Sequence, residues 1–528
     1  MYMIDLERLN VRDFFDEARA AAPDVPFLVF TGDDSQYTYR QAGELIDRAA
    51  AAWHHLGVRK GDRVAFMLDN SPEFIWAWLG LAQIGGILVA VNTGFRDAEA
   101  GYLVSDSGSL FVLAGEKHVP VMRAVQNGLP HVRVLHGDAG PDSFTALMAE
   151  DLPPAPRAEL AGDDVISLIY TSGTTGDPKG VMQTHRNFVL TGQAYVDWMR
   201  MEPGDRIYAC LPLFHINSQA YSTMAAIAAR GGLVLSPRFS ASRFWPEVRR
   251  HHVTVFNFIG AMAVILTKSE PSPDDADNDV RIAYGVPALA PELVDEIETR
   301  FGLSCISGFG MSETTFGLLE PLDEPRRPGS MGVPRNHPDP SVPRTQAKIV
   351  DATGAEVPPG TAGELLLKNA AMMAGYFGLP EKTAETLVDG WLHTGDSAYQ
   401  DEDGFFFFVD RLKDIVRRRG ENVSSLEVER TVARHPGIAE AAVIGVPAEL
   451  SDEELLLFVV PRDPDAPISP DEVFSWAAEN LASFKVPQYL RYLDALPKTA
   501  TAKVQKEKLR AMDADAPEAR IARASARR

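Results

Sequence analysis

The stretch Tyr170-Thr-Ser-Gly-Thr-Thr-Gly-Asp-Pro-Lys-Gly180 gathers hydroxyl side chains, glycines and a lysine in one short segment. It follows an apolar, β-branched run at 165–170 that predicts a buried strand. Glycine lets a backbone approach a polyanion, and successive N–H groups form an anion-binding nest. Hydroxyl donors and a lysine charge strengthen such a nest. The stretch therefore predicts a phosphate-binding loop made of Thr171, Ser172, Gly173, Thr174, Thr175, Gly176 and Lys179.

The loop differs from a Walker A motif, in which Gly-Lys-Ser/Thr opens a helix. Here Lys179 follows Pro178 and precedes Gly180, so no helix is expected to start at the lysine. The pattern resembles the phosphate loop of the adenylate-forming superfamily, which contains acyl-CoA synthetases, free-standing adenylation domains and beetle luciferases. The resemblance covers nearly the whole chain and implies ATP, AMP and coenzyme A as ligands.

The composition is that of a globular protein, with 528 residues, 45% hydrophobic and 23% charged. This length predicts two or more domains. A net charge of −22 argues against nucleic-acid binding, and it requires any site for ATP or coenzyme A to be a local positive pocket. Cys210 and Cys305 have neither metal-ligand spacing nor a disulfide framework, which fits the cytoplasm. We expect no signal peptide and no membrane span, because no apolar run approaches roughly 20 residues.

Strand and helix signals alternate through the first two thirds of the chain. Residues 63–91 predict a strand, a helix at 72–84 and a second strand, and residues 281–307 repeat that order. Such units predict an α/β fold of parallel sheets flanked by helices, with ligands beyond the carboxyl ends of the strands. Three loops that follow strands are expected to meet at one crevice. They begin at Thr171, Gly285 and Gly308.

Near residue 344 the pattern of alternating strands and helices ends, and turn signals begin to separate short predicted strands. We therefore predict a large N-terminal AMP-binding domain at 1–410, which includes an antiparallel β module at about 344–410. The remaining residues, 411–528, predict a small, mobile α+β domain. Within it, Ser424 and Glu427 form a capping-box pattern that opens a helix.

The motif Phe309-Gly-Met-Ser-Glu-Thr314 resembles the superfamily's Tyr-Gly-Met-Thr-Glu motif. On its own, a Gly-Met-Ser-Glu tetrad is more typical of a helix start. The resemblance implies that Glu313 binds Mg²⁺, Ser312 contacts the α-phosphate and Phe309 stacks on adenine. The residue types agree, since a hard cation prefers carboxylate and phosphate oxygens and an aromatic face suits a base.

Other pocket residues follow from the resemblance alone. Residues 256–262 and 308–311, with Gly308 and Gly310, are expected to form walls of the acyl pocket. The motif Leu211-Pro-Leu-Phe-His215 implies that His215 lies near the acyl site, although a structural histidine is the alternative. The adenine pocket is expected to include Gly285, Val286 and Pro287. Val286 is bulkier than the residue usual in this superfamily.

Two motifs imply ribose and catalytic contacts. Trp391-Leu-His-Thr-Gly-Asp396 resembles a Thr-Gly-Asp motif whose carboxylate, here Asp396, accepts hydrogen bonds from the ribose hydroxyls. Arg411 is expected on the ribose or phosphate. Leu496-Pro-Lys-Thr-Ala-Thr-Ala-Lys503 resembles the C-terminal motif in which a lysine, here Lys503, bridges the substrate carboxylate and the α-phosphate. Ala502 stands where the superfamily has glycine, and at a positive φ it would cost roughly 1–2 kcal/mol.

The segment from Asp410 to Ser424 resembles the superfamily's hinge and thioester-forming segment. Lys413 matches the hinge position, and Gly420 matches the glycine past which pantetheine runs. Arg417 is expected near the nucleotide or the phosphates of coenzyme A, and Glu421 lies in the same segment. Arg418 and Arg419 share the expectation stated for Arg417, and a basic, solvated strand edge is the alternative for them.

Together these features predict an ATP-dependent acid–thiol ligase that makes a CoA thioester through an acyl-adenylate. Phe214-His-Ile-Asn, Phe484-Lys-Val-Pro and Gly420-Glu-Asn-Val-Ser-Ser resemble the subgroup of crotonobetaine/carnitine-CoA ligases. One alternative, motivated by Ala502 and Val286, is an enzyme that mainly performs thioesterification on an adenylate supplied by a partner enzyme. Others are a carrier-protein-loading enzyme and a nucleotide-binding regulatory protein without turnover. The acid and the oligomeric state stay open, a homodimer included.

Overall fold

The computed structural model describes residues 5–137, 140, 143–171, 178–323, 326–418, 421–447, 453–499 and 503–523. Contacts divide the chain into two units. One consists of Met1–Ala347 and Leu366–His393, and the other of Lys348–Leu365 and Thr394–Arg528. Both parallel and antiparallel sheets occur, and helices pack on them, which confirms the predicted α/β fold class.

Within the described part of the first unit, one sheet has six strands, parallel except at one edge. Its strand order is β6 (Arg133–His136), β5 (Phe111–Ala114), β3 (Arg63–Met67), β4 (Ile87–Ala90), β7 (Val165–Thr171) and β8 (Lys179–Thr184). The edge pair β7–β8 is antiparallel. β7 confirms the buried strand expected before the phosphate loop.

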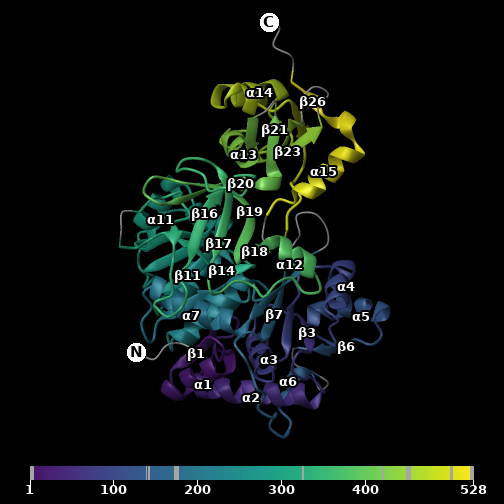
Figure 1. Ribbon diagram of the computed structural model, residues 1–528, viewed down its shortest axis with the longest axis vertical. Coiled ribbons are helices and arrows are strands. Elements are labelled where there is room, and N and C mark those ends of the chain that lie inside the picture. Colours follow the sequence, from purple (N-terminus) through teal and green to yellow (C-terminus); the bar gives the residue numbers. More distant parts are fainter. Residues whose placement is uncertain are drawn as a thin grey trace. The chain divides into compact units, whose positions relative to one another are not determined.

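The six-stranded sheet is buried on both faces, which explains why its strands are continuous apolar runs. Side chains alternate along β3, so Val64 and Phe66 join one core, whereas Ala65 and Met67 join another. Helices α2 (Tyr39–His55), α3 (Pro72–Gln83) and α6 (Phe144–Met148) cover the first face, and α4 (Asp97–Asp106) and α5 (Val119–Gly128) cover the second (Figure 1).

The other large sheet of this unit has nine described strands. Their order is β15 (Val333–Pro334), β14 (Thr314–Leu319), β13 (Ser304–Met311), β12 (Ile282–Val286), β11 (Val255–Ile259), β9 (Arg206–Ala209), β10 (Gly232–Leu235), β1 (Pro26–Phe30) and β2 (Ser35–Thr38). Strands β1 and β9–β13 run parallel to one another, and the outer strands β2, β14 and β15 pair antiparallel. Helices of this region are α1 (Val11–Ala21), α7 (His185–Trp198), α8 (Met224–Ala228), α9 (Ala241–Arg250), α10 (Gly260–Thr267), α11 (Pro291–Phe301) and α12 (Pro380–Thr386).

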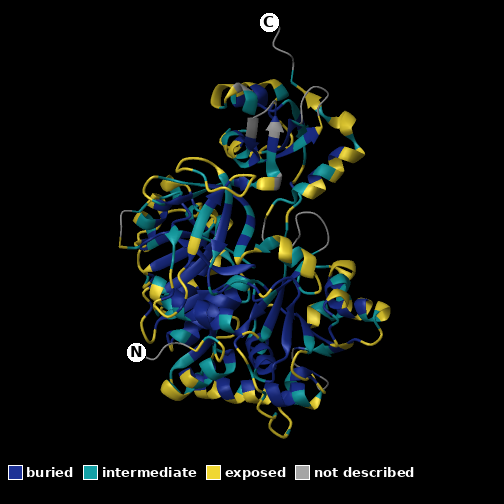
Figure 2. Cartoon of the chain, viewed as in Figure 1, coloured by how far each residue is buried: buried dark blue, intermediate teal, exposed yellow. Residues whose placement is uncertain are grey.

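One hydrophobic core joins the two large sheets through the helices between them. It contains residues of β1 and β12 together with residues of β3 and β7, and it includes the buried faces of α2, α3 and α7. Figure 2 shows these strands as buried almost throughout. Helices α2 and α3 cross closely at Gly80, where a Cβ would lie 2.6 Å from the Cβ of Ala49 and 2.7 Å from the backbone nitrogen of Ala50. Only glycine fits this crossing without displacement.

The five-stranded sheet contains β16 (Gln346–Val350), β17 (Gly363–Lys368), β18 (Leu387–Val388), β19 (Trp391–Gln400) and β20 (Phe406–Arg411). β19 pairs antiparallel with β18 and β20. The rest of the second unit has a described hairpin, β21 (Ile415–Arg418) and β22 (Glu421–Ser424), and a sheet of β23 (Ile438–Pro447), β24 (Glu453–Pro461), β25 (Tyr489–Tyr492) and β26 (Ile521–Ala522). Its helices are α13 (Ser425–Ala433), α14 (Pro470–Asn480) and α15 (Lys506–Asp515).

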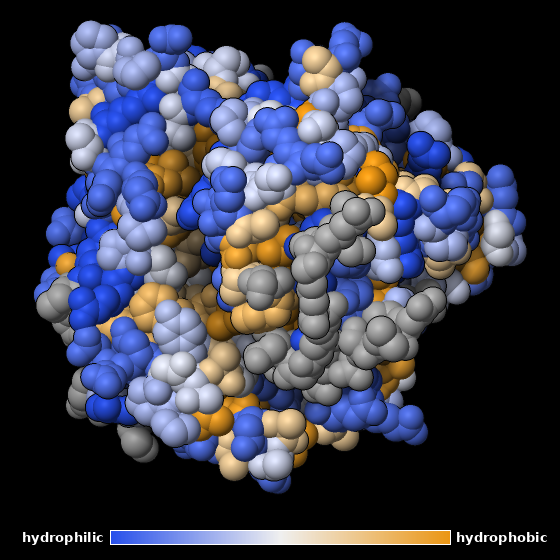
Figure 3. Space-filling model, turned by 90° about the horizontal axis from the view of Figure 1, so that it is seen from above, coloured by the Kyte–Doolittle hydropathy of each residue, from blue (hydrophilic) through white to orange (hydrophobic). Residues whose placement is uncertain are grey.

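Hydrophilic residues cover most of the face in Figure 3, and hydrophobic patches lie between them. In the ranges that the structure describes, no helix is both long enough and apolar enough to cross a bilayer. The large hydrophobic side chains that are exposed come from several separate elements, for example Val264 of α10, Val388 of β18 and Met512 of α15.

Candidate functional site

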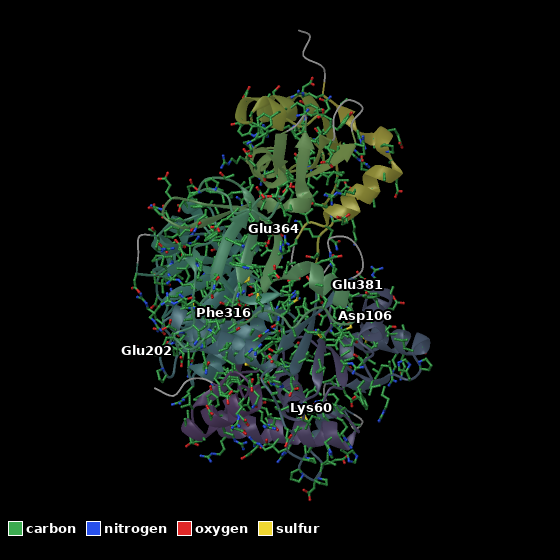
Figure 4. The ribbon with its side chains drawn as sticks, viewed as in Figure 1. Lys60, Asp106, Glu202, Phe316, Glu364 and Glu381 are labelled. Carbon is green, nitrogen blue, oxygen red and sulfur yellow. The ribbon has the colours of Figure 1, made fainter. Side chains whose placement is uncertain are left out.

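The two ends of the predicted phosphate loop are held together by the β7–β8 pair. Thr171 lies opposite Lys179, and Tyr170 lies opposite Gly180. The hydroxyl of Tyr170 donates to Asp106 Oδ2 on α4 at 2.6 Å, which fixes the end of β7 to the neighbouring helix (Figure 4). Ser172, Gly173, Thr174, Thr175 and Gly176 lie outside the described residues. The structure therefore shows where the loop begins and ends. That the loop binds phosphate stays a prediction.

Lys179 is half-buried at the start of β8. Its Nζ lies 5.3 Å from the centre of the Tyr376 ring, within range of a cation–π contact. Burial lowers the pKa of Lys179, the positive charge of Lys382 lowers it further, and the negative charge of Glu313 raises it. The electrostatic effect of Glu313 on Lys179 indicates that these two predicted site residues share one region.

Ser312 and Glu313 form the turn between β13 and β14. These strands are antiparallel, and Met311 pairs with Thr314. The tetrad is therefore a hairpin turn and not a helix start. The side chain of Gln183 on β8 donates to the carbonyl oxygen of Ser312 at 2.5 Å. This bond attaches the turn to the strand that begins with Lys179.

The carboxylate of Glu313 is buried and held by a tyrosine. Glu313 is 7% exposed, and the hydroxyl of Tyr376 donates to its Oε1 at 2.9 Å. Among the described residues, no group of three or more His, Cys, Asp and Glu side chains could hold a metal ion. Mg²⁺ commonly uses one or two carboxylates together with substrate phosphates, so a single buried carboxylate in a turn attached to β8 fits that ion.

Tyr376 is a site residue that the sequence did not reveal. It is separated from Glu313 by 63 positions. A tyrosine after a glycine gives no local sign that its hydroxyl will meet a distant carboxylate. Only the tertiary fold brings the two together.

β12 and β13 are neighbouring parallel strands, as expected, but Gly308 lies inside β13 and does not begin a loop. Gly285 pairs with Ser307, next to Gly308. Gly285 is buried, and a Cβ there would lie 2.1 Å from the Phe258 ring, so glycine allows β11 and β12 to pack at this point. Val286 is half-buried at the end of β12, and Pro287 after it is exposed.

Phe309 lies at a narrow cavity. Phe309 lines it together with Tyr221, Tyr284 and Thr315. Gly310 lies next to Tyr221, whose hydroxyl would be 2.9 Å from a Cβ on that glycine. The Tyr221 hydroxyl donates to the carbonyl oxygen of Thr315 at 2.5 Å. This bond ties β14 to a π-helix, η2 (Asn217–Thr223).

His215 lies two positions before this π-helix, and its side chain is half-buried. Its ring contacts that of Phe214, with centroids 4.6 Å apart. The π-helix anchors Asn257 of β11, because the amide of Asn257 donates to Asn217 Oδ1 and to Ser222 Oγ, both at 3.1 Å. π-helical turns often occur at functional sites. The role of His215 at an acyl site stays a prediction.

Asp396 and Arg411 pair across β19 and β20 in the second unit. Asp396 is fully buried, and its Oδ1 lies 2.7 Å from Arg411 Nε. The backbone N–H of Gly395 donates to Glu364 Oε1 at 3.1 Å (Figure 4), and Gly395 has a φ of +68°. A glycine suits that backbone conformation. The Thr-Gly-Asp motif therefore lies inside β19, with Gly395 in a left-handed backbone conformation.

The predicted hinge segment caps a helix. Asp410 is buried, and its Oδ2 accepts hydrogen bonds from the hydroxyls of Ser424 and Ser425 and from the N–H of Leu426 at the start of α13. Lys413 lies in the following 3₁₀ turn, Leu412–Asp414. The side chains of Lys413, Arg417 and Glu421 are not among those described, and Gly420 lies outside the described residues.

Arg418 is a structural residue. It is 2% exposed, donates to the carbonyl oxygens of Phe484 and Val486, and forms an ion pair with Glu454 at 2.5 Å. The alternative of a solvated strand edge is thus wrong at this position, because the guanidinium is buried and bonded to protein groups.

Lys503 is exposed, three positions before α15. Its backbone N–H donates to Thr499 Oγ1 at 3.2 Å, and its carbonyl oxygen accepts from the N–H of Thr499 at 2.8 Å. Lys506, at the start of α15, pairs with Glu429 at 2.7 Å. Residues 500–502 lie outside the described residues, so the conformation of Ala502 stays open.

Two family descriptions match the chain. The one named AMP-binding enzyme matches residues 15–377, and AMP-binding enzyme C-terminal domain matches residues 427–503. The chain belongs to the AMP-binding enzyme family. This result confirms the resemblance inferred from the phosphate-loop and C-terminal motifs.

Relatives within the family are CoA ligases. The crotonobetaine/carnitine-CoA ligase of Salmonella paratyphi A is 34% identical over 520 residues, which cover 95% of this chain and 99% of the relative. The anthranilate CoA ligase AuaEII, solved with anthranoyl-AMP, has a TM-score of 0.85 and 26% identity, and the match covers 98% of this chain and 99% of that one. O-succinylbenzoate coenzyme A synthetase from Bacillus subtilis, solved with AMP, has a TM-score of 0.83 and 27% identity, covering 94% and 97%. This AMP-binding enzyme is an acid–thiol ligase.

Proposed function

We propose that the protein converts a small-molecule carboxylic acid into its CoA thioester by way of an acyl-adenylate. The observation that carries this proposal is the bond between Gln183 and the Ser312-Glu313 turn. It attaches a buried carboxylate that suits Mg²⁺ to the strand that starts with Lys179. The relatives solved with AMP and with anthranoyl-AMP support the same chemistry.

In the first step, a carboxylate oxygen of the acid attacks the α-phosphorus of ATP, and the bond to pyrophosphate breaks. Two anions approach each other, so the reaction depends on local positive charge. We propose that Lys179 and the predicted loop hold the phosphates and that Ser312 donates to the α-phosphate. Glu313 would hold Mg²⁺, which neutralises phosphate charge when bound. Lys503 would lie between the attacking carboxylate and the α-phosphate.

In the second step, the thiol sulfur of coenzyme A attacks the acyl carbon of the adenylate. The carbon–oxygen bond to AMP breaks, and the thiol proton leaves to solvent or buffer. We propose that the segment around Gly420 admits the pantetheine arm. Because Lys503 and Gly420 serve different steps, we further propose that the C-terminal domain rotates about Lys413 between them.

The test is a panel of acids with ATP, Mg²⁺ and coenzyme A, assayed for pyrophosphate and thioester. The names of the relatives suggest crotonobetaine, carnitine and anthranilate as starting members, with short aliphatic acids beside them. We expect at least one acid to give pyrophosphate and thioester in equal amounts. A protein that forms no thioester from any acid, nor from synthetic acyl-adenylates, would contradict the proposal.

A second function is favoured by Ala502, which precedes Lys503, and by Val286 in the predicted adenine pocket. These residues motivate a ligase that mainly converts an adenylate supplied by a partner. Ala502→Gly is the decisive variant. If it raises pyrophosphate release at least tenfold while thioesterification of a synthetic adenylate is unchanged, the parent is impaired in adenylation. Brisk pyrophosphate release by the parent would exclude this alternative.

A further inference from the structure

Residues 371–377 form a bridging segment between the two large sheets of the first unit. On one side the segment contacts the Glu313 turn. The N–H of Met373 donates to the carbonyl oxygen of Glu313 at 2.8 Å, and the N–H of Thr315 donates to that of Ala371 at 3.3 Å. Met372 and Thr314 form an antiparallel bridge between these bonds.

On its other side the bridging segment pairs with β8. The N–H of Ala374 donates to the carbonyl oxygen of Met182 at 3.0 Å, and the N–H of Met182 donates to that of Gly375 at 2.9 Å. Phe377 continues the pairing with a bond to Gly180 at 2.8 Å. The segment thus joins β8 to the hairpin that carries Glu313 through backbone hydrogen bonds on both of its sides.

The side chain of Tyr376 contacts both Glu313 and Lys179. Its hydroxyl donates to Glu313 Oε1 at 2.9 Å, and its ring faces Lys179 Nζ at 5.3 Å. The tyrosine is 7% exposed, and its backbone N–H donates to Thr383 Oγ1 at 2.9 Å. Packing and this hydrogen bond therefore restrict its position.

We propose that Tyr376 is a positioning residue that orients Glu313 for Mg²⁺ through its hydroxyl and supports Lys179 for phosphate through its ring. The proposal rests on the proposed function, because it takes Glu313 as the metal ligand and Lys179 as a phosphate ligand. A carboxylate fixed in one rotamer loses less conformational freedom when a cation binds. A lysine over an aromatic face is likewise held near its working position.

The two roles can be separated by two substitutions. Tyr376→Phe removes the hydroxyl and keeps the ring, whereas Tyr376→Leu removes both. A matched control exists in the same unit, since the buried Tyr208 donates its hydroxyl to Glu247 Oε2 at 2.6 Å in a different part of the sheet. Tyr208→Phe therefore deletes an equivalent tyrosine–glutamate bond away from the proposed site.

The readout is ATP binding by calorimetry, without any acid, in excess EDTA and in excess Mg²⁺. We expect Tyr376→Phe to bind ATP without metal as tightly as the wild type does. The increase in ATP affinity that Mg²⁺ causes should be roughly tenfold smaller in the variant, because a hydrogen bond to a charged group contributes about that much. Tyr376→Leu should in addition weaken metal-free ATP binding by about two- to fivefold, because a partly exposed cation–π contact is lost. Tyr208→Phe should match the wild type in both conditions.

Three results would contradict these expectations. If Tyr376→Phe retains the full Mg²⁺-dependent gain, Tyr376 does not orient Glu313. If Tyr208→Phe shows the same loss as Tyr376→Phe, the effect is one of general destabilisation, and the positioning role is overturned. If the wild type gains nothing from Mg²⁺ and makes no thioester, the proposed function itself fails, and melting curves of all variants distinguish that result from misfolding.

Discussion

Arg411 Nε lies 2.7 Å from Asp396 Oδ1, directly across the β19–β20 pair. Asp396 is fully buried, and the Arg411 side chain is 38% exposed. Removing one partner of such a pair leaves the other charge poorly compensated. The carboxylate is thus held in place by a partner whose own side chain is partly exposed to solvent.

We expect Asp396→Asn to weaken ATP binding by roughly tenfold to a hundredfold, because hydrogen bonds to a charged acceptor are replaced by weaker ones. The wild type should also bind 2′-deoxy-ATP and 3′-deoxy-ATP less well than ATP, and the variant should lose this discrimination. Calorimetric titration of the three nucleotides gives both quantities. Equal discrimination by both proteins would show that Asp396 is not the ribose acceptor.

Lys503 is predicted to act in the first half-reaction only. We expect Lys503→Ala to reduce pyrophosphate release by about 10²- to 10³-fold, as when one charge-stabilising group is lost. Thioester formation from a synthetic acyl-adenylate should be retained. Lys508→Ala, at an exposed position of α15, is the control and should leave both half-reactions unchanged. Equal losses in both half-reactions would argue for a structural role of Lys503.

His185 provides a pH prediction for stability. Burial lowers the pKa of His185 from 6.5 to about 4, and its Nδ1 accepts from the N–H of Val11 at 3.2 Å. The unfolded chain therefore binds a proton below pH 6.5 that the folded protein binds only near pH 4. Stability from this group is present above pH 6.5 and is lost as the pH falls toward 4, by about 2 kcal/mol between pH 7.5 and 5.

Urea unfolding of the wild type and His185→Gln at both pH values measures this contribution. We expect the wild type to lose more stability than the variant over the interval. His131→Gln, at an exposed position, should follow the wild type. Parallel pH profiles for the wild type and His185→Gln would refute the assignment.

Two glycines in helices give opposite predictions for stability. Gly80→Ala places a Cβ 2.6 Å from that of Ala49, so overpacking should destabilise the protein by about 1–3 kcal/mol. At Gly101 of α4 the nearest contact of a new Cβ is an ordinary 3.7 Å, to Val125. Gly101→Ala should therefore stabilise by up to about 1 kcal/mol through helix propensity. Urea midpoints measure both, and shifts of the same sign would contradict the packing argument.

Local signals predicted many elements well. The helix expected at 72–84 is α3, Pro72–Gln83, and Ser71 caps it as its sequence indicates. The unit expected at 281–307 is β12, α11 and β13, with Gly302 ending the helix at a φ of +69°. In these cases caps, glycines and apolar runs specify the conformation over a few residues.

Long-range features could not be predicted in this way. The tetrad Gly310-Met-Ser-Glu313 is compatible with a helix start, yet the pairing of β13 with β14 makes Ser312 and Glu313 a hairpin turn. The contact of Tyr376 with Glu313 depends on the bridging segment. That segment pairs through backbone groups, which every residue type has, so its pairing cannot be recognised in the sequence. The π-helix η2 was also missed, and its contact with Asn257 of β11 joins residues that are far apart in the sequence.

The antiparallel arrangement of β7 and β8 has a consequence for the electrostatics of phosphate binding. In loops of the Walker type, a helix begins at the lysine and turns the positive end of its macrodipole toward the phosphates. Here Lys179 is the first residue of a strand, and helix α7 does not begin until His185. Strands carry little net dipole, so β8 adds almost no attractive field of its own. In a chain with a net charge of −22, an anionic nucleotide would then depend on discrete cations for its binding, and its affinity should fall steeply as the ionic strength rises.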